Sequence, residues 1–151
     1  MRKITTSYRF FEVVAGALLI VSSLAGCDPA INSVRVEPGN VPRQPVFVLA
    51  DSSGRGVSGL IYGISVVPCG ADSAVWQIAA TGSKGAPARL EYGVTPDGFA
   101  VRAGPQPLRP GCYDVIVSNG RPARFRVSSD GRVVPERPPA RDSAPPDRGP
   151  I

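Results

Sequence analysis

The sequence predicts an all-β fold, a single antiparallel β-sandwich of about seven to eight short strands. Three observations lead to this class. Short runs of alternating apolar and polar residues recur through residues 33–134, which is typical of half-buried strands. Each run is closed by Gly, Pro, Asn or Asp, the residues of turns. No stretch after residue 27 has a helical period of useful length.

Eight runs are predicted as strands, each between five and eight residues long. In chain order they are Ser33 to Glu37, Val46 to Asp51, Leu60 to Val67, Ala74 to Thr81, Ala88 to Val94, Phe99 to Ala103, Cys112 to Ser118 and Ala123 to Ser128. In the fourth run Trp76 alternates with Ile78, so we predict that Trp76 is the central core residue. The alternative is a sugar-stacking platform on the outer face.

Thr95-Pro96-Asp97-Gly98 predicts a first hairpin, because it has the composition of a type I turn followed by a glycine that allows positive φ. With these four residues as the loop, Tyr92 lies opposite Val101 on an apolar face. Glu91 then lies opposite Arg102 on the other face. An apolar face and an opposite-charge pair in one register favour pairing of the fifth run with the sixth.

A second hairpin is predicted to turn at Asn119-Gly120, and the charged residues of its two strands select the length of the loop. A two-residue loop would bury Asp114 beside Phe125. A three-residue loop, Ser118 to Gly120 with the glycine in a bulge, instead pairs Tyr113 with Phe125 inward and Asp114 with Arg124 outward. We therefore predict the three-residue loop.

The start of the seventh run carries a motif. Leu108-Arg109-Pro110-Gly111-Cys112-Tyr113-Asp114-Val115 resembles the L-x-P-G-x-Y-x-V segment shared by fibronectin type III-like, immunoglobulin-like and transthyretin-like sandwiches. In those families the tyrosine ties a loop to the strand, so the resemblance implies a tyrosine corner at Tyr113. The motif is common to several superfamilies, and it implies a fold without implying a function.

The first 27 residues have the order of an export signal, in which basic residues precede an apolar core, Val13 to Val21. This core is shorter than the roughly 20 residues of an ordinary membrane span. Leu24-Ala25-Gly26-Cys27 follows and resembles the lipobox of bacterial lipoproteins. The resemblance implies that Leu24, Ala25 and Gly26 end the signal peptide, which is removed, and that Cys27 is acylated. Two or three acyl chains anchor stably, at about 0.8 kcal/mol per buried methylene. The alternatives are an uncleaved transmembrane anchor and an ordinary signal peptide.

We therefore divide the chain into a signal peptide (1–26), a lipidated cysteine with a short tether (27–32), the β-sandwich (33–134) and a tail (135–151). The tether extends at most about 17 Å, so we expect the domain close to the bilayer. The tail has six prolines, three positive charges and three negative charges. We expect it to be disordered and partly polyproline. A ligand for a proline-binding module is the alternative.

Three cysteines are present, so Cys69 and Cys112 remain once Cys27 is lipidated. Outside the cytoplasm two remaining thiols are expected to pair, and we predict a Cys69–Cys112 disulfide. Two buried free thiols are the alternative. There is no C-x-x-C spacing and no histidine, which leaves a zinc or thioredoxin-like site without ligands. We predict no metal and no cofactor.

Catalytic patterns are missing from the sequence. Without histidine there is no Ser-His-Asp or Cys-His arrangement, so we predict a protein that is not an enzyme. Gly54 to Gly59 spells G-x-G-x-x-G, but a strand rather than a helix is expected to follow, which predicts a flexible loop. From Asp28 onward 14 basic residues face 11 acidic ones, a net charge of +3, too weak for a nucleic-acid binder.

Four arginines form a candidate basic surface on the C-terminal strands: Arg124 and Arg126 on one face, with Arg121 and Arg132 nearby. Such a surface suits anionic lipid headgroups or an acidic envelope polymer. The alternative, which the sequence favours, is a solvated edge strand whose charges block unwanted strand pairing.

The sequence thus predicts a non-enzymatic, lipid-anchored, extracytoplasmic sandwich that binds or supports another component of a bacterial envelope. Its partners would be the membrane, through Cys27, and an envelope protein or polysaccharide. Two alternatives remain, a carbohydrate- or peptidoglycan-binding module and a hydrolase that uses carboxylates alone. Asp28 resembles the signal that keeps lipoproteins of enteric bacteria in the inner membrane, which favours a periplasm-facing inner-membrane location over the outer membrane.

Overall fold

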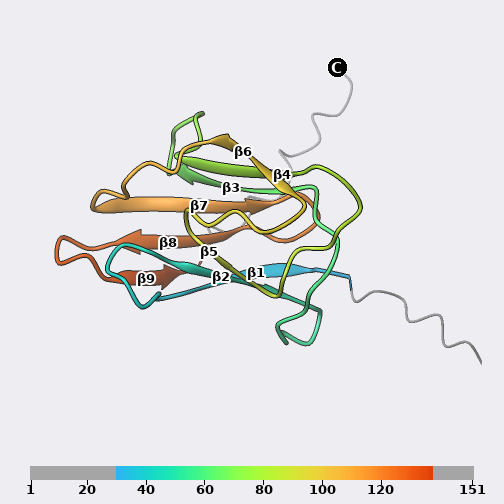
Figure 1. Cartoon of the computed structure of the whole chain (residues 1–151). Coiled ribbons are helices and arrows are strands. Elements are labelled where there is room, and N and C mark those ends of the chain that lie inside the picture. Colours follow the sequence, from blue (N-terminus) through green and yellow to red (C-terminus); the bar gives the residue numbers. More distant parts are fainter. Residues whose placement is uncertain (1–29, 138–151) are drawn as a thin grey trace, which may run out of the picture.

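The computed structural model describes residues 30–137, and it confirms the all-β prediction. Nine strands form two antiparallel sheets that pack together as a β-sandwich (Figure 1). The strands are β1 (Ser33–Glu37), β2 (Val46–Ala50), β3 (Gly63–Pro68), β4 (Trp76–Ala80), β5 (Arg89–Glu91), β6 (Phe99–Ala103), β7 (Gly111–Val117), β8 (Ala123–Val127) and β9 (Val133–Glu136).

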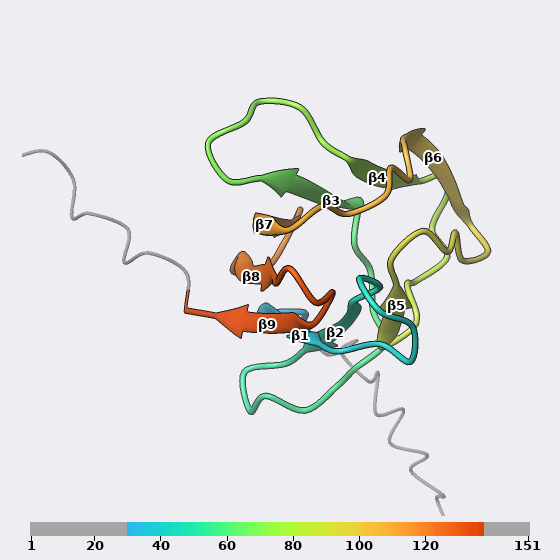
Figure 2. The ribbon, with the colours of Figure 1, turned by 90° about the vertical axis from the view of Figure 1, so that its left-hand side faces the viewer.

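The two sheets are unequal in size. The smaller has the order β1-β2-β5, and the larger has the order β6-β4-β3-β7-β8-β9. The larger sheet curls from β6 to β9 until its last strands lie beside β1 (Figure 2). A single parallel bridge joins Ser33 to Arg121 at this junction. The sandwich is therefore nearly closed along the side formed by β1, β8 and β9.

The two sheets meet at an apolar layer in which five aromatic rings follow one another. Trp76 of β4 stacks on Phe47 of β2 with ring centroids 5.9 Å apart, and Phe47 lies 6.2 Å from Phe125 of β8. Tyr92 extends the chain beyond Trp76 at 5.3 Å, and Tyr113 extends it beyond Phe125 at 5.3 Å. Trp76 is fully buried, as predicted for the central core residue.

Strand β2 is covered on both faces. All five of its residues are buried, and Phe47 and Leu49 belong to the central core. Because β2 is the middle strand of the smaller sheet, an uninterrupted apolar run rather than an alternating one suits its position. The backbone of Gly56 packs against the other face, so close to Val48 that an added Cβ would lie 3.1 Å from its Cγ1.

The strand directions define two ends of the sandwich (Figure 1). The proximal end is where the described chain begins, and it carries the loops 51–62, 81–88 and 118–122. The distal end carries the loops 38–45, 69–75, 104–110 and 128–132. Because β1 runs from the proximal to the distal end, residues 38–45 lie at the end opposite to the first described residues.

The predicted second hairpin is confirmed in register. Tyr113 pairs with Phe125, Asp114 with Arg124 and Val115 with Ala123. The tyrosine corner that the sequence resemblance implies is also present, because the Tyr113 hydroxyl accepts a hydrogen bond from the Arg109 amide at 3.0 Å and donates one to the Arg109 carbonyl at 2.9 Å.

The predicted first hairpin is wrong, because its two strands lie in different sheets. Strand β5 pairs with β2, and β6 pairs with β4. The chain between them passes from one sheet to the other, so Glu91 does not face Arg102 and Val101 is exposed rather than buried beside Tyr92. Leu90 of β5 and Phe99 of β6 are buried, as they would also be in a hairpin. The alternation therefore did not distinguish a hairpin from a crossover.

The ninth strand corrects the predicted boundary between domain and tail. Pro135 and Glu136 were assigned to the tail, but β9 includes both and pairs with β8. A proline is tolerated here because β9 is an edge strand and one side of its backbone needs no donor. Residues 138–151, the remainder of the predicted tail, lie outside the described residues.

The predicted Cys69–Cys112 disulfide is present and joins the end of β3 to β7 across 43 positions of sequence, with the two Cα atoms 5.4 Å apart. The Cys69 amide also donates a hydrogen bond to the Cys112 carbonyl at 3.0 Å. The disulfide therefore connects two strands that are already neighbours in the larger sheet.

Replacing both residues, as Cys69→Ala with Cys112→Ala, is expected to lower the free energy of unfolding by up to about 4 kcal/mol, because the closed loop restricts the unfolded chain. Urea unfolding followed by Trp76 fluorescence measures this, with the reduced wild-type protein as the matched control. Equal stability of the oxidised wild-type protein and the double variant would contradict the expectation.

Candidate functional site

Several of the predicted site residues lie outside the described residues. These are Leu24, Ala25, Gly26 and Cys27 of the lipobox, together with Asp28. The predicted lipid anchor and location therefore remain expectations from sequence. The described residues, 30–137, form the domain that such an anchor would hold at the membrane.

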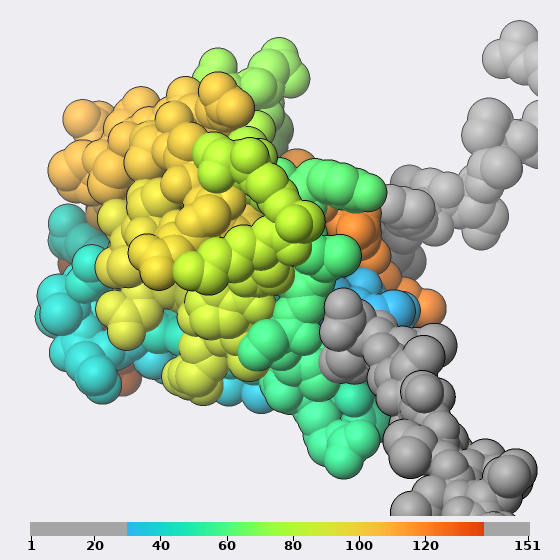
Figure 3. Space-filling view, turned by 45° about the vertical axis from the view of Figure 1, so that its right-hand side comes forward, coloured from blue at the N-terminus to red at the C-terminus, as the bar shows by residue number. Residues whose placement is uncertain are grey.

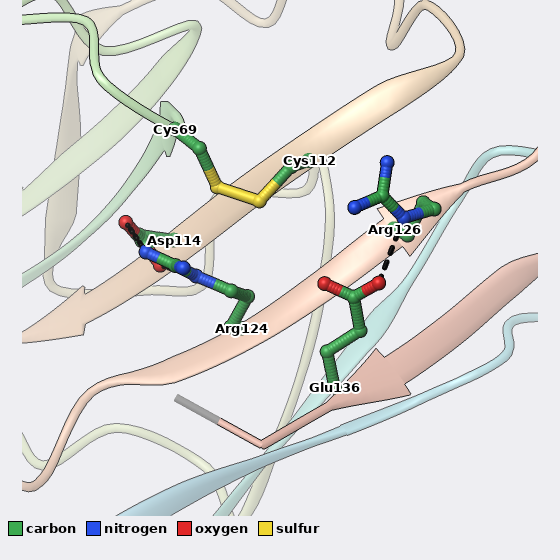
Figure 4. The surroundings of a disulfide bond; sticks show 6 residues. All are labelled: Cys69, Cys112, Asp114, Arg124, Arg126 and Glu136. Carbon is green, nitrogen blue, oxygen red and sulfur yellow. Dashed lines mark hydrogen bonds and ion pairs between the residues drawn. A yellow bond between two sulfur atoms is a disulfide. The ribbon is translucent and has the colours of Figure 1, made fainter. Parts of the chain in front are cut away.

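Two of the four predicted surface arginines lie in an ion-pair network on the outer face of the larger sheet, beside the disulfide (Figure 4). Arg124 binds Asp114 of β7 through two hydrogen bonds of 2.7 and 2.9 Å. Arg126 binds Glu136 of β9 at 2.7 Å. The hydrogen bonds that the Arg124 guanidinium donates to Asp114 raise the pKa of Arg124. This network crosses three neighbouring strands, and each arginine charge is compensated by a carboxylate.

The other two arginines lie at opposite ends of the molecule. Arg132 pairs with Asp130 at 2.9 Å in the distal turn between β8 and β9. Arg121 lies at the proximal end, where its amide donates a hydrogen bond to the Asn32 carbonyl at 2.8 Å. The four residues therefore do not form one continuous surface.

The favoured explanation for the arginines, a charged edge strand, is wrong for β8. Strand β9 pairs along its outer side, so β8 is an interior strand of the larger sheet. The arginines of β8 serve instead in cross-strand pairs on the solvent face, which contribute about 0.2 to 1 kcal/mol each.

Three hollows at the distal end surround the β1–β2 loop. One of about 340 Å³ lies between this loop and the β8–β9 turn, and it is lined by Val41 and Val134 among others. A second of about 200 Å³ includes Arg89 and Glu91. A third of about 420 Å³ lies between the loop and residues 105–108. Residues 38–44 therefore form a ridge between three concave surfaces.

This ridge was not predicted as a site from the sequence. The feature of the sequence that could have indicated the ridge is its proline content. Prolines 38, 42 and 45 lie in one distal loop, and prolines 105, 107 and 110 lie in another. Val41 at the ridge is 55% exposed. Prolines fix φ, so a proline-rich loop loses little further freedom when it binds a partner.

The two tyrosines at the ends of the aromatic chain hold the 104–110 loop in place. The Tyr92 hydroxyl donates a hydrogen bond to the Gln106 carbonyl at 2.6 Å, and Tyr113 binds Arg109 as described above. Gly104 has a φ of +67°, and a Cβ there would lie 2.0 Å from the Val75 carbonyl oxygen, so only glycine fits. The distal surface is thus supported directly by the core.

Four further ionisable groups of the domain have pKa values shifted in the direction that favours the form present at neutral pH. Burial raises the pKa of Tyr92 to about 12. Hydrogen bonds lower the pKa of three carboxyl groups, from Arg35 and Arg89 to Glu37, from Ser53 to Asp51, and from Ser128 to Asp130. A carboxyl group with a lowered pKa stays ionised at neutral pH, so these three are poorly suited to act as general acids.

Gly54 to Gly59 lies in the loop between β2 and β3, as predicted, and no helix follows it. The Asp51 carboxylate caps this loop by accepting hydrogen bonds from the Ser53 amide at 2.8 Å and the Arg55 amide at 3.1 Å. An acidic side chain at this position does not suit a phosphate-binding loop.

Within residues 30–137, no group of three or more Cys, Asp or Glu side chains is placed to hold a metal ion. The same residues contain no apolar helix of membrane-spanning length. Of their seven aromatic side chains, only Tyr62 is exposed, so no line of aromatics follows the described face of either sheet. Neither the 340 Å³ hollow nor the other two distal hollows is lined by two carboxylates.

Comparisons with protein-family models, with curated proteins and with solved structures found no match for this chain.

Tyr92→Phe tests how the core supports the distal loop. The pKa of Tyr92 is raised from 10 to about 12, so its neutral form is the one the fold stabilises. This contribution is complete below pH 10 and is lost as pH rises through 12. Wild-type protein is expected to lose about 2 kcal/mol of stability between pH 10 and 12 relative to Tyr92→Phe. Rapid urea unfolding of both proteins at each pH measures this loss of stability. Parallel pH profiles of the free energy of unfolding for the two proteins would contradict the expectation.

Proposed function

We propose that this protein is a lipid-anchored, extracytoplasmic β-sandwich of a bacterial cell envelope that binds or supports another envelope component without catalysing a reaction. The observation that carries the proposal is Leu24-Ala25-Gly26-Cys27 after a short apolar segment, which resembles a lipobox. Asp28 favours retention in the inner membrane, with the domain facing the periplasm.

Two features of the domain support an extracytoplasmic location. The Cys69–Cys112 disulfide is of the kind that persists in oxidising compartments. The chain also uses its third cysteine at the position where a lipoprotein is acylated, which leaves no unpaired thiol in this arrangement.

The distal end supports a binding role. Loops gathered at one end of a sandwich commonly carry its function, and here they form concave surfaces held by the core. The first and third surfaces present prolines and the exposed side chain of Val41, and two of the ionisable side chains that line the first, Asp130 and Arg132, pair with each other. Such a surface is better suited to binding a protein partner than to catalysing a reaction.

The anchor is tested by intact-mass spectrometry of the protein extracted from membranes. We expect a chain that begins at Cys27 and carries acyl groups, because the acylated thiol directs cleavage before it. Cys27→Ser is expected to remain unacylated and to keep its first 26 residues. An unmodified wild-type chain that still begins at Met1 would contradict the proposal.

The distal binding surface is tested by a photoreactive amino acid at Val41, which is 55% exposed. We expect a specific cross-linked envelope protein, because Val41 lies on the ridge between the hollows. The same amino acid at Val101, which is 46% exposed on β6, is the matched control. Identical products at both positions, or none at Val41, would reject the distal surface.

A further inference from the structure

The proximal end, where the described residues begin, exposes two large apolar side chains. Tyr62 is 76% exposed, the highest exposure among the large hydrophobic residues of the described part, and Leu60 is 52% exposed. Figure 3 turns this end forward, and the green residues near position 60 lie beside the orange of the 118–122 loop and the blue of β1. We name Leu60 and Tyr62 the proximal pair.

Hydrogen bonds of its backbone groups hold Tyr62 in a defined place. The Tyr62 amide donates to the Ser118 hydroxyl at 2.8 Å, and the Tyr62 carbonyl accepts from the Ala80 amide at 2.9 Å. The hairpin that contains Ser118 is bound in turn to the start of the described residues through the bond from the Arg121 amide to the Asn32 carbonyl. Tyr62, the hairpin and Asn32 therefore form one connected surface.

Arg121, Arg55 and Lys84 are exposed cations at this end, and the last two pair with carboxylates. Arg121 is exposed and forms no ion pair with another residue of the described part. Arg55 is 83% exposed, and its Nε is 3.8 Å from Asp51. Lys84 pairs with Asp97 at 3.0 Å, and both side chains are largely exposed. Exposed cations beside apolar side chains are typical of a surface that meets anionic headgroups.

We infer that the proximal end rests on the membrane, with Tyr62 and Leu60 seated at the boundary between headgroups and acyl chains and Arg121 close to lipid phosphates. This inference rests on the proposed acylation of Cys27. Asn32 is the fifth residue after Cys27, so the Cα atoms of these two residues lie within about 17 Å of each other. Asn32 is bonded to the 118–122 hairpin loop, which in turn holds Tyr62.

A bilayer suits this surface better than a second copy of the chain. A stable protein interface buries roughly 800 Å² on each partner, which two side chains do not supply. A bilayer needs no shape complementarity, and tyrosine favours the membrane–water boundary because its ring is apolar and its hydroxyl is polar. In this orientation the distal hollows, at the opposite end of β1, face away from the membrane.

The test uses the full-length acylated protein in vesicles of phosphatidylethanolamine and phosphatidylglycerol, with bromine on the acyl chains as the quencher. Tyr62→Trp adds a reporter at the proximal end, and Val41→Trp adds a matched reporter at the distal end. Trp76 is buried and common to both variants. We expect brominated lipid to reduce the added fluorescence of Tyr62→Trp roughly two-fold and to leave that of Val41→Trp unchanged. Leu60→Trp provides a second proximal reporter.

Co-flotation of the wild-type protein with the vesicles separates the two proposals. Failure of the wild-type protein to float overturns the lipid anchor and the orientation together. Flotation with equal quenching of Tyr62→Trp and Val41→Trp overturns the orientation alone. A blue shift of Tyr62→Trp without quenching also overturns it, because burial would then be against protein. Thermal unfolding of each variant verifies that the fold is kept.

Discussion

The packing of Phe47 on Trp76 is the interaction on which the rest of the structure depends. The smaller sheet has only three strands, so its apolar face needs the larger sheet to cover it. Phe47 is the residue through which β2 meets both Trp76 and Phe125. The chain of rings continues to Tyr92 and Tyr113, whose hydroxyl groups hold the 104–110 loop. Core packing thereby shapes the distal surface that we propose as a binding site.

The outer face of the larger sheet adds a second constraint, on register rather than on packing. The disulfide, the Asp114–Arg124 pair and the Arg126–Glu136 pair lie side by side across β3, β7, β8 and β9 (Figure 4). Their positions alternate with the buried residues of the same strands, as the period of two requires. A slip of one residue would bring these charges into the core, so the network specifies one alignment.

Sequence reasoning succeeded where the deciding contacts were local or chemically specific. Asp114 and Arg124 selected the loop length of their hairpin because the wrong choice would have buried a charge beside Phe125. The same reasoning failed for Glu91 and Arg102, which suggested a hairpin that does not form. Strand β9 was missed because the proline-rich composition that begins at Pro135 is typical of a tail, although Pro135 itself lies in a short edge strand.

The sequence by itself determined the all-β class, the buried position of Trp76, the register of β7 with β8 and the partners of the disulfide. Each follows from alternation, from charge or from the small number of cysteines. Only the tertiary structure decided which sheet β5 and β6 join, where the hollows lie, and that Tyr62 lies at the same end of the sandwich as the first described residues. The physical reason is that an alternating strand exposes the same hydrogen-bonding edge to any neighbour, so its partner is chosen by the packing of the whole domain.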